Sequence, residues 1–238
     1  MRLRSVSFGL PWNMPQSTRT RAVPMSSRYC EPVTVVAPPR NVSSNARDLP
    51  GSAAILAASM FGPLLAGEKV TLRPGRADDA EHFVRWFADT EVTRHLGRHT
   101  AVALYQEEEF LKRIGESKDD VWWMIDAEGK AIGATGIHRI SWLDANGTTG
   151  TMIGEKDCWH KGYATEAMRL RTRYAFRELN LHKLMTEVDV ENVASRKALE
   201  RNGYRTVGVR REQNFSAGKW HDRWLGEVLR EDWEKREA

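Results

Sequence analysis

Cysteine is scarce in this chain, whose 238 residues include only Cys30 and Cys158. Two cysteines at this separation form no spacing that is typical of a disulfide framework or of a zinc site. We therefore expect no metal site and a reducing, cytoplasmic location for the protein.

Long apolar runs are missing as well. The apolar segment Ser52–Ala66 has fifteen residues and is interrupted at Gly62 and Pro63, whereas a membrane-spanning helix needs about 20 apolar residues. Neither a signal peptide nor a membrane anchor is therefore predicted. No internal repeat is evident, so the regular part of the chain is expected to form one domain.

Lysine is absent from the first 66 residues, which carry seven arginines and two acidic residues, a balance of +5. The chain has 36 basic and 32 acidic residues in total, so the other 172 residues hold 29 basic and 30 acidic side chains, a balance of −1. The basic character belongs to the N-terminal segment. A nearly neutral domain gives no argument for nucleic-acid binding, and no nucleic-acid partner is expected.

Residues 1–59 contain seven prolines among many Ser, Thr, Asn and Arg residues, and no periodicity persists beyond Val33–Ala37. The prolines prevent the amphipathic helix of an organelle transit peptide. Three interpretations stay open: a natural start at Met25 or Met60, a disordered tail, or a targeting segment. We expect residues 1–66 to be an extension, either disordered or upstream of the natural start, and residues 67–235 to be the domain.

From Lys69 onward, periodic apolar residues predict strands and helices in the order β-α-α-β-β-β-α-β-α-β-β. Runs of antiparallel strands joined to helical crossovers predict an α/β fold, in which helices cover both faces of a central, twisted, mixed sheet. On the helix after Gly162, the apolar residues share one face, and the arginines are expected on the other. The predicted elements are strand Lys69–Arg73, helices around Ala80–Phe87 and Ala103–Ile114, strands Val121–Asp126, Lys130–Ile140 and Thr148–Lys156, helix Ala164–Leu179, strand Lys183–Val190, helix Val193–Arg201, and strands Tyr204–Glu212 and Asp222–Arg230.

The segment Met152–Ala167 places a strand, a turn and a helix start in direct succession. At a helix start several backbone N–H groups lack an intrahelical partner and the helix dipole adds positive charge, so the junction favours a phosphate or pyrophosphate. Gly162 lets the backbone approach a ligand without a Cβ atom, and Ala164 keeps the next turn narrow. Taken alone, this pattern is equally typical of small residues that allow close packing.

The longer string Trp-His-Lys-Gly-Tyr-Ala-Thr-Glu-Ala, from Trp159 to Ala167, resembles the coenzyme A signature of the GCN5-related N-acetyltransferases. Motif A of that family runs Gln/Arg-x-x-Gly-x-Gly/Ala. The string is most similar to the branch of the ribosomal-protein N-terminal acetyltransferases, which often reads Trp-Gly-Lys-Gly-Tyr-Ala-Thr-Glu-Ala. Asn192–Tyr204 resembles the family's Asn-x-x-Ser…Gly-Phe/Tyr helix. The resemblance covers Glu68 to Trp233.

The resemblance implies the acyl-CoA N-acyltransferase fold and direct attack of a primary amine on the thioester of acetyl-CoA, without a metal. It implies that the pantetheine arm lies between strands Thr148–Lys156 and Lys183–Val190, with the pyrophosphate at Lys161–Thr165. The residues expected to bind the cofactor are Met152, Ile153, Gly154, Trp159, His160, Lys161, Gly162, Tyr163, Ala164, Thr165, Asn192, Ser195 and Lys197.

Three positions depart from the family pattern. Trp159 replaces the leading Gln or Arg of motif A, and His160 stands where the branch usually has Gly. Histidine is among the residues that tolerate a positive φ, should the turn require one. Glu200 stands where many members have a tyrosine that acts as general acid toward the leaving thiolate.

Ser195 is the candidate proton donor for the thiolate, and Glu155, at the end of the central strand, is the candidate base. Each has a structural alternative: a serine on a helix often bonds the backbone, and a carboxylate at a strand end is often simply solvated. Other candidates with equally plain alternatives are His138 and His221 as bases, Lys161, Arg196 and Lys197 as phosphate contacts, and Glu187 and Asp189 as the acceptor lining.

The acceptor is expected to be a protein N-terminal α-amine or a small-molecule amine. A lysine amine with a pKa of about 10.4 costs about 4 kcal/mol to deprotonate at cellular pH, whereas an N-terminal amine at about 7.7–8.0 costs under about 1 kcal/mol. No buried base is obvious, which favours the α-amine. Alternatives are acetylation of an amino sugar, aminoglycoside or polyamine, a non-catalytic acetyl-CoA sensor, and nucleic-acid binding through the tail. The protein is expected to be a monomer or homodimer.

Overall fold

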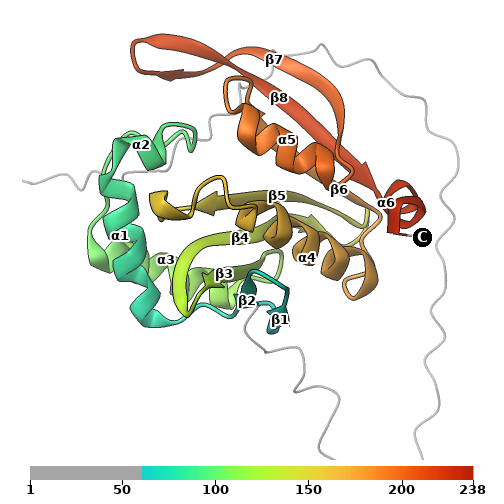
Figure 1. Ribbon diagram of the computed structural model, residues 1–238, viewed down its shortest axis with the longest axis horizontal. Helices are drawn as coiled ribbons and strands as arrows, with labels where there is room; N and C mark the ends of the chain where they lie inside the picture. The colour runs from blue at the N-terminus through green and yellow to red at the C-terminus, as the bar shows by residue number, and fades with distance from the viewer. Residues whose placement is uncertain (1–60, 238) are drawn as a thin grey trace, which may run out of the picture. The chain divides into compact units, whose positions relative to one another are not determined.

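The computed structural model describes residues 61–237, in which eight strands form one sheet with the order β1-β2-β3-β4-β5-β6-β8-β7 (Figure 1). Strands β5 and β6 are parallel, and all other neighbours are antiparallel. The mixed sheet that the sequence predicts is thus confirmed. The strands are β1 (Leu65–Ala66), β2 (Thr71–Arg73), β3 (Val121–Ala127), β4 (Lys130–Ser141), β5 (Asn146–Ile153), β6 (Lys183–Asp189), β7 (Arg205–Ser216) and β8 (Lys219–Leu229).

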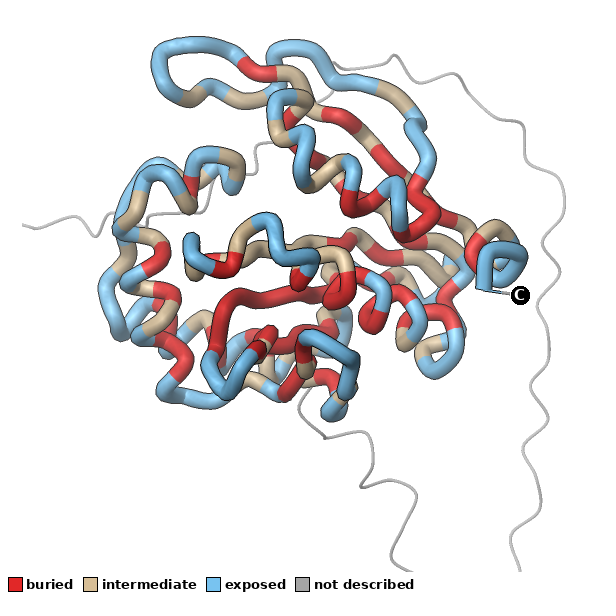
Figure 2. Tube along the Cα trace, in the orientation of Figure 1, coloured by how far each residue is buried: buried red, intermediate tan, exposed pale blue. Residues whose placement is uncertain are grey.

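Helices cover both faces of the sheet because its central strands are apolar on both sides. Successive side chains of a strand point to opposite faces, so Trp123 of β3 packs in the cluster that contains α4 and α5, while Trp122 packs in the cluster that contains α1 and α3. Figure 2 shows nearly continuous burial along β4 and an exposed tip on the β7–β8 hairpin. The helices are α1 (Ala80–Ala88), α2 (Thr90–Thr93), α3 (Leu104–Glu116), α4 (Tyr163–Arg177), α5 (Val193–Arg201) and α6 (Arg230–Glu237), with short 3-10 turns at Ala77–Asp79 and Lys156–Cys158.

The sheet begins earlier in the chain than the sequence indicates. Phe61 packs on Trp122 with ring centroids 6.0 Å apart, the indole of Trp123 donates to the carbonyl of Pro63 at 2.9 Å, and β1 pairs with β2. Residues 61–66, which the sequence analysis assigns to the N-terminal extension, are therefore in contact with the sheet. The predictions for residues 1–60 lie outside the described residues. No helix between residues 61 and 237 is long and apolar enough to cross a membrane.

Strands β5 and β6 diverge after three residue pairs. Their register runs from Asn146 opposite Lys183 to Thr148 opposite Met185, yet β5 continues to Ile153 and β6 to Asp189. The free ends of the two strands therefore separate, as the resemblance implies. This opening lies beside the start of α4 and the start of α5, and it determines where the site is built.

Glu166, in the first turn of α4, fastens this helix to the turn between β1 and β2. Its carboxylate is buried and accepts hydrogen bonds from the backbone N–H groups of Glu68 at 2.6 Å and Lys69 at 2.8 Å. Bonds to a charged acceptor contribute about 1.5–3 kcal/mol each, but the exposed turn can rehydrate its N–H groups.

We expect Glu166→Ala to lower the free energy of unfolding in urea by about 2 kcal/mol. The exposed Glu178, at the other end of α4, provides the control, because Glu178→Ala should change stability by less than about 0.5 kcal/mol. Equal stability of the two variants would show that the carboxylate does not hold the turn.

Candidate active site

A cleft of about 730 Å³ lies between the N-termini of α4 and α5. The turn before α4 and the first helical residues form one wall, the start of α5 forms another, and the end of β5 forms the floor. Eleven of the thirteen predicted cofactor residues line this cleft: Met152, Ile153, Trp159, His160, Gly162, Tyr163, Ala164, Thr165, Asn192, Ser195 and Lys197. The sequence motifs thus converge on one cleft, and their roles toward a ligand stay predictions.

The other two predicted residues, Gly154 and Lys161, do not line the cleft. A Cβ atom on Gly154 would overlap the indole of Trp86, and its N–H donates to the carbonyl of Ile132 at 2.8 Å. Gly154 therefore permits close packing of β5 on α1. Lys161 is exposed in the turn.

The turn before α4 uses the left-handed region of the Ramachandran map twice. His160 has φ +62° and Gly162 has φ +86°, so the positive φ that the family's glycine suggests at position 160 is indeed adopted by histidine. Gly162 precedes the helix and offers no side-chain cap. The N–H groups of the first turn of α4 are consequently left without an intrahelical acceptor beside the cleft.

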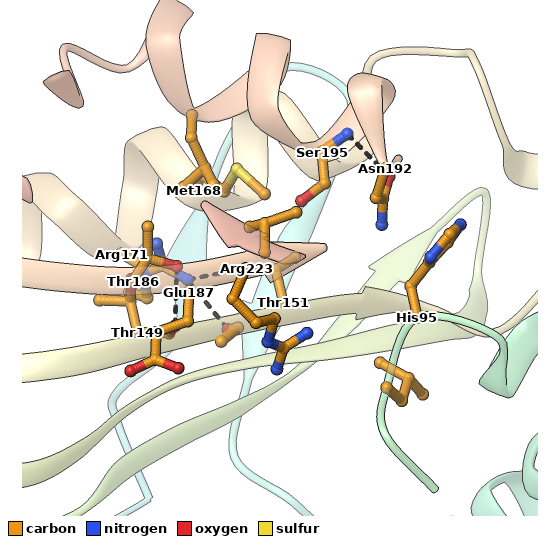
Figure 3. A pocket seen from close by; sticks show the side chains of 14 residues that line it. His95, Thr149, Thr151, Met168, Arg171, Thr186, Glu187, Asn192, Ser195 and Arg223 are labelled. Carbon is orange, nitrogen blue, oxygen red and sulfur yellow. Dashed lines mark hydrogen bonds between the residues drawn. The ribbon is translucent and has the colours of Figure 1, made fainter. Parts of the chain in front are cut away.

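A smaller cavity of about 170 Å³ lies where β5 and β6 separate (Figure 3). It opens onto the cleft, because six residues line both: His95, Leu96, Thr151, Met168, Asn192 and Ser195. The inner part of the cavity is lined by Thr149, Gly150, Arg171, Thr186, Glu187, Val188, Leu199 and Arg223.

Ser195 lies at the junction of the cleft and the cavity. Its backbone N–H donates to the side-chain oxygen of Asn192 at 3.1 Å, so Asn192 caps α5. Figure 3 shows the Ser195 hydroxyl turned toward the cavity, and no other described side chain or backbone group forms a hydrogen bond with it. The hydroxyl is therefore not used as a helix cap.

Glu155 and Glu200 lie outside both the cleft and the cavity. Glu155 accepts a hydrogen bond from the indole of Trp86 at 2.8 Å and forms an ion pair with Arg85. Glu200 lies 3.7 Å from Arg196 on the exposed side of α5. These contacts favour the structural alternative for Glu155, and they separate Glu200 from the cavity.

The other two candidate bases, His138 and His221, form hydrogen bonds away from the cleft and the cavity. His138 of β4 bonds Asp120 at 3.1 Å and lowers the pKa of that carboxyl to about 2. His221 is buried and bonds the carbonyl of Ser216 at 3.0 Å. Neither histidine lines the cleft or the cavity. Of the other candidates, Glu187 lines the cavity and is bonded to Arg210 at 2.6 Å.

Among the cavity residues that the sequence did not single out are His95 and Arg171. His95 follows α2, and its Nδ1 lies 3.1 Å from the carboxylate of Asp189, another acceptor-site candidate. Arg171 of α4, expected on the exposed face with the other arginines, is only 1% exposed. The expectation for Arg171 was wrong because its position, four residues after Ala167 and four before Ala175, belongs to the buried face.

The guanidinium of Arg171 has neutral partners. It donates to the hydroxyl of Thr151 at 2.7 Å, to the hydroxyl of Thr135 at 2.9 Å and to the carbonyl of Gly150 at 2.9 Å. Burial lowers its pKa, and among residues 61–237 its electrostatic partner is the hydroxyl of Tyr204, at 3.4 Å, rather than a carboxylate. A positive charge without a counter-ion is thus fixed at the cavity wall.

Comparison with known proteins shows which family this chain belongs to. A family model described as an acetyltransferase (GNAT) domain matches residues 69–205. The chain belongs to the GNAT family. It is an N-acetyltransferase, and the enzymes of this family use acetyl-CoA as the acyl donor.

Two proteins from Bacillus species align with much of this GNAT domain. "Uncharacterized N-acetyltransferase p20" of Bacillus licheniformis is 25% identical over 171 residues, which is 70% of this chain and 96% of the relative. "Putative ribosomal N-acetyltransferase YdaF" of Bacillus subtilis (strain 168) is 30% identical over 107 residues, 45% of this chain and 58% of the relative.

A solved GNAT structure confirms the fold. The spermidine N-acetyltransferase from Vibrio cholerae in complex with CoA and spermine superposes with a TM-score of 0.66 at 20% identity, covering 71% of this chain and 99% of that chain. At this identity the likeness concerns the fold alone.

Proposed function

We propose that this GNAT enzyme transfers the acetyl group of acetyl-CoA to a primary amine, either the N-terminal α-amine of a protein or a small-molecule amine. The observation that carries the proposal is the junction of the 730 Å³ cleft with the 170 Å³ cavity at the separated ends of β5 and β6. The larger cleft suits the pantetheine and phosphates of the cofactor, and the smaller cavity beside it suits an acetyl group and an amine.

The start of α4 is the proposed pyrophosphate site. Its uncapped N–H groups and the helix dipole favour an anion, and Gly162 lets the phosphate approach the backbone. Lys197 and Arg201 line the same cleft from α5 and add positive charge. The pantetheine is proposed to lie along β5 near Met152 and Ile153, where β5 has no strand partner on the side of β6.

Positioning and electrostatic stabilisation supply the chemistry, because the thioester is already activated. Attack of the amine places negative charge on the carbonyl oxygen and then on the leaving sulfur. A fixed cation and a hydroxyl donor near those atoms stabilise that charge. Arg171 and Ser195, which line the cavity from α4 and α5, are proposed for these two roles.

The experiment combines calorimetry with turnover on the full chain. We expect acetyl-CoA to bind and CoA release to occur with a panel of α-amine peptides, amino sugars, aminoglycosides, polyamines and lysine peptides. At pH 7, α-amines should exceed lysine side chains in kcat/KM by about 100-fold, because their ordinary pKa values differ by more than two units. Binding without turnover of any amine would make the protein a sensor and contradict the proposal, whereas turnover of polyamines alone would exclude the protein α-amine and leave a small-molecule amine as the acceptor.

A further inference from the structure

We propose that His95, held by Asp189, is the general base that takes the proton of the acceptor amine. This inference rests on the proposed acetyl transfer and deepens it. His95 follows α2, and its Nδ1 lies 3.1 Å from Oδ2 of Asp189. The Asp189 side chain is only 5% exposed and also accepts a hydrogen bond from Arg223 at 3.0 Å. Asp189 thus orients the imidazole, and Arg223 holds Asp189 in place.

The hydrogen bond to Asp189 determines which ring nitrogen is available. A carboxylate only accepts, so in the neutral imidazole Nδ1 carries the proton and Nε2 carries the lone pair. Among the hydrogen bonds of the described residues, none involves Nε2 of His95. A base oriented by a third group in this way is the arrangement that proton abstraction requires.

The position of His95 matches the reaction centre. It lines both the cleft and the cavity, and it lies across their opening from Asn192 and Ser195 (Figure 3). No other histidine between residues 61 and 237 lines the cavity. His160 lines only the cleft, at the proposed phosphate end.

The amine nitrogen forms the C–N bond to the thioester carbonyl and gives one proton to Nε2 of His95, which becomes an imidazolium stabilised by Asp189. The C–S bond breaks, the electron pair leaves with sulfur, and the thiolate receives a proton either directly from solvent or from the Ser195 hydroxyl, which regains its proton from solvent. His95 then returns its proton to solvent.

Several charged groups surround the imidazole and enter its pH dependence. Carboxylates and cations are equal in number among these groups, four of each. The charged residues that line the same hollows or bond to the ring are the carboxylates Glu91, Glu187, Asp189 and Glu191 and the cations Arg171, Lys197, Arg201 and Arg223.

The chain offers a matched control, because His138 and Asp120 form a second pair with the same 3.1 Å separation, away from both hollows. We expect His95→Gln to lower kcat/KM for the accepted amine by about 100-fold or more, to remove the acid limb of the pH profile, and to change the acetyl-CoA Kd less than threefold. Asp189→Asn should also lower kcat/KM, because the carboxylate that orients the imidazole is lost. His138→Gln should leave rate and profile unchanged.

The outcomes separate this inference from the proposed function. Wild-type protein that acetylates no amine defeats the proposed function itself. The role of His95 is overturned if the wild type is active and a folded His95→Gln variant keeps the full kcat/KM and an unchanged acid limb of the pH profile. Asp189→Asn also removes a charged partner of Arg223, so its stability is checked by thermal melts. If Asp189→Asn unfolds, the result for His95→Gln alone decides the inference.

Discussion

A Gly162→Val variant is expected to bind acetyl-CoA at least tenfold more weakly than the wild type, a loss of about 1.4 kcal/mol. Gly162 lines the cleft, and a Cβ atom at this position would meet only Nζ of Lys69, at 3.6 Å. The space beside it is therefore open on the side where the pyrophosphate is proposed to lie. A branched side chain would occupy that space and cover the N–H groups of the first turn of α4.

Backbone strain has to be separated from this effect. Gly162 has φ +86°, so valine there also costs about 1–3 kcal/mol of stability. Gly218, at the tip of the β7–β8 hairpin, has φ +80°, and a Cβ atom there would meet no atom within 4 Å. Gly218→Val should therefore lower Tm similarly and leave the Kd from calorimetry unchanged. Equal affinities of both folded variants would remove the start of α4 as the phosphate site.

The fold was largely predictable from the sequence where a segment shows a clear periodicity of apolar residues and contains the residues that end a helix or strand. Helix α5 has the predicted bounds, Val193–Arg201, and the glycine after it, Gly203, adopts φ +88° as a left-handed cap does. Helix α6 was missed because Trp233 is its one buried residue, packed on Phe176 at 5.5 Å. A single apolar side chain gives no period, so tertiary packing decides this helix.

Only those parts of the site that lie in continuous segments of the chain were predictable from the sequence. The turn before α4 and the start of α5 are continuous segments, so their residues could be assigned to one ligand from the sequence. His95 and Asp189 are 94 positions apart, and the sequence contains nothing that pairs them before the sheet is assembled. For Arg171, the helical spacing already indicated the buried face, but its charge was taken as a sign of exposure.

Ser195 is the residue whose loss should most affect departure of the thiolate. Asn192 already caps α5, so the Ser195 hydroxyl is not needed for the helix. We expect Ser195→Ala to lower kcat by about 10–100-fold. General acid catalysis contributes about 10²–10⁴-fold, and a thiol with an ordinary pKa near 8.5 leaves fairly well unaided, which places the effect at the low end. The acetyl-CoA Kd should change far less, because backbone groups are proposed to hold the pyrophosphate.

A double variant tests whether Glu200, rather than Ser195, protonates the thiolate. Glu200 occupies the position of the tyrosine acid in many relatives, yet it is exposed, lies 3.7 Å from Arg196 and lines neither hollow. Ser195→Ala combined with Glu200→Ala should therefore be no slower than Ser195→Ala alone in a steady-state assay with the accepted amine. A further drop in the double variant would give Glu200 a part in protonation. Full kcat in Ser195→Ala would instead show that another group protonates the thiolate, either solvent or the hydroxyl of Thr151, which also lines both hollows.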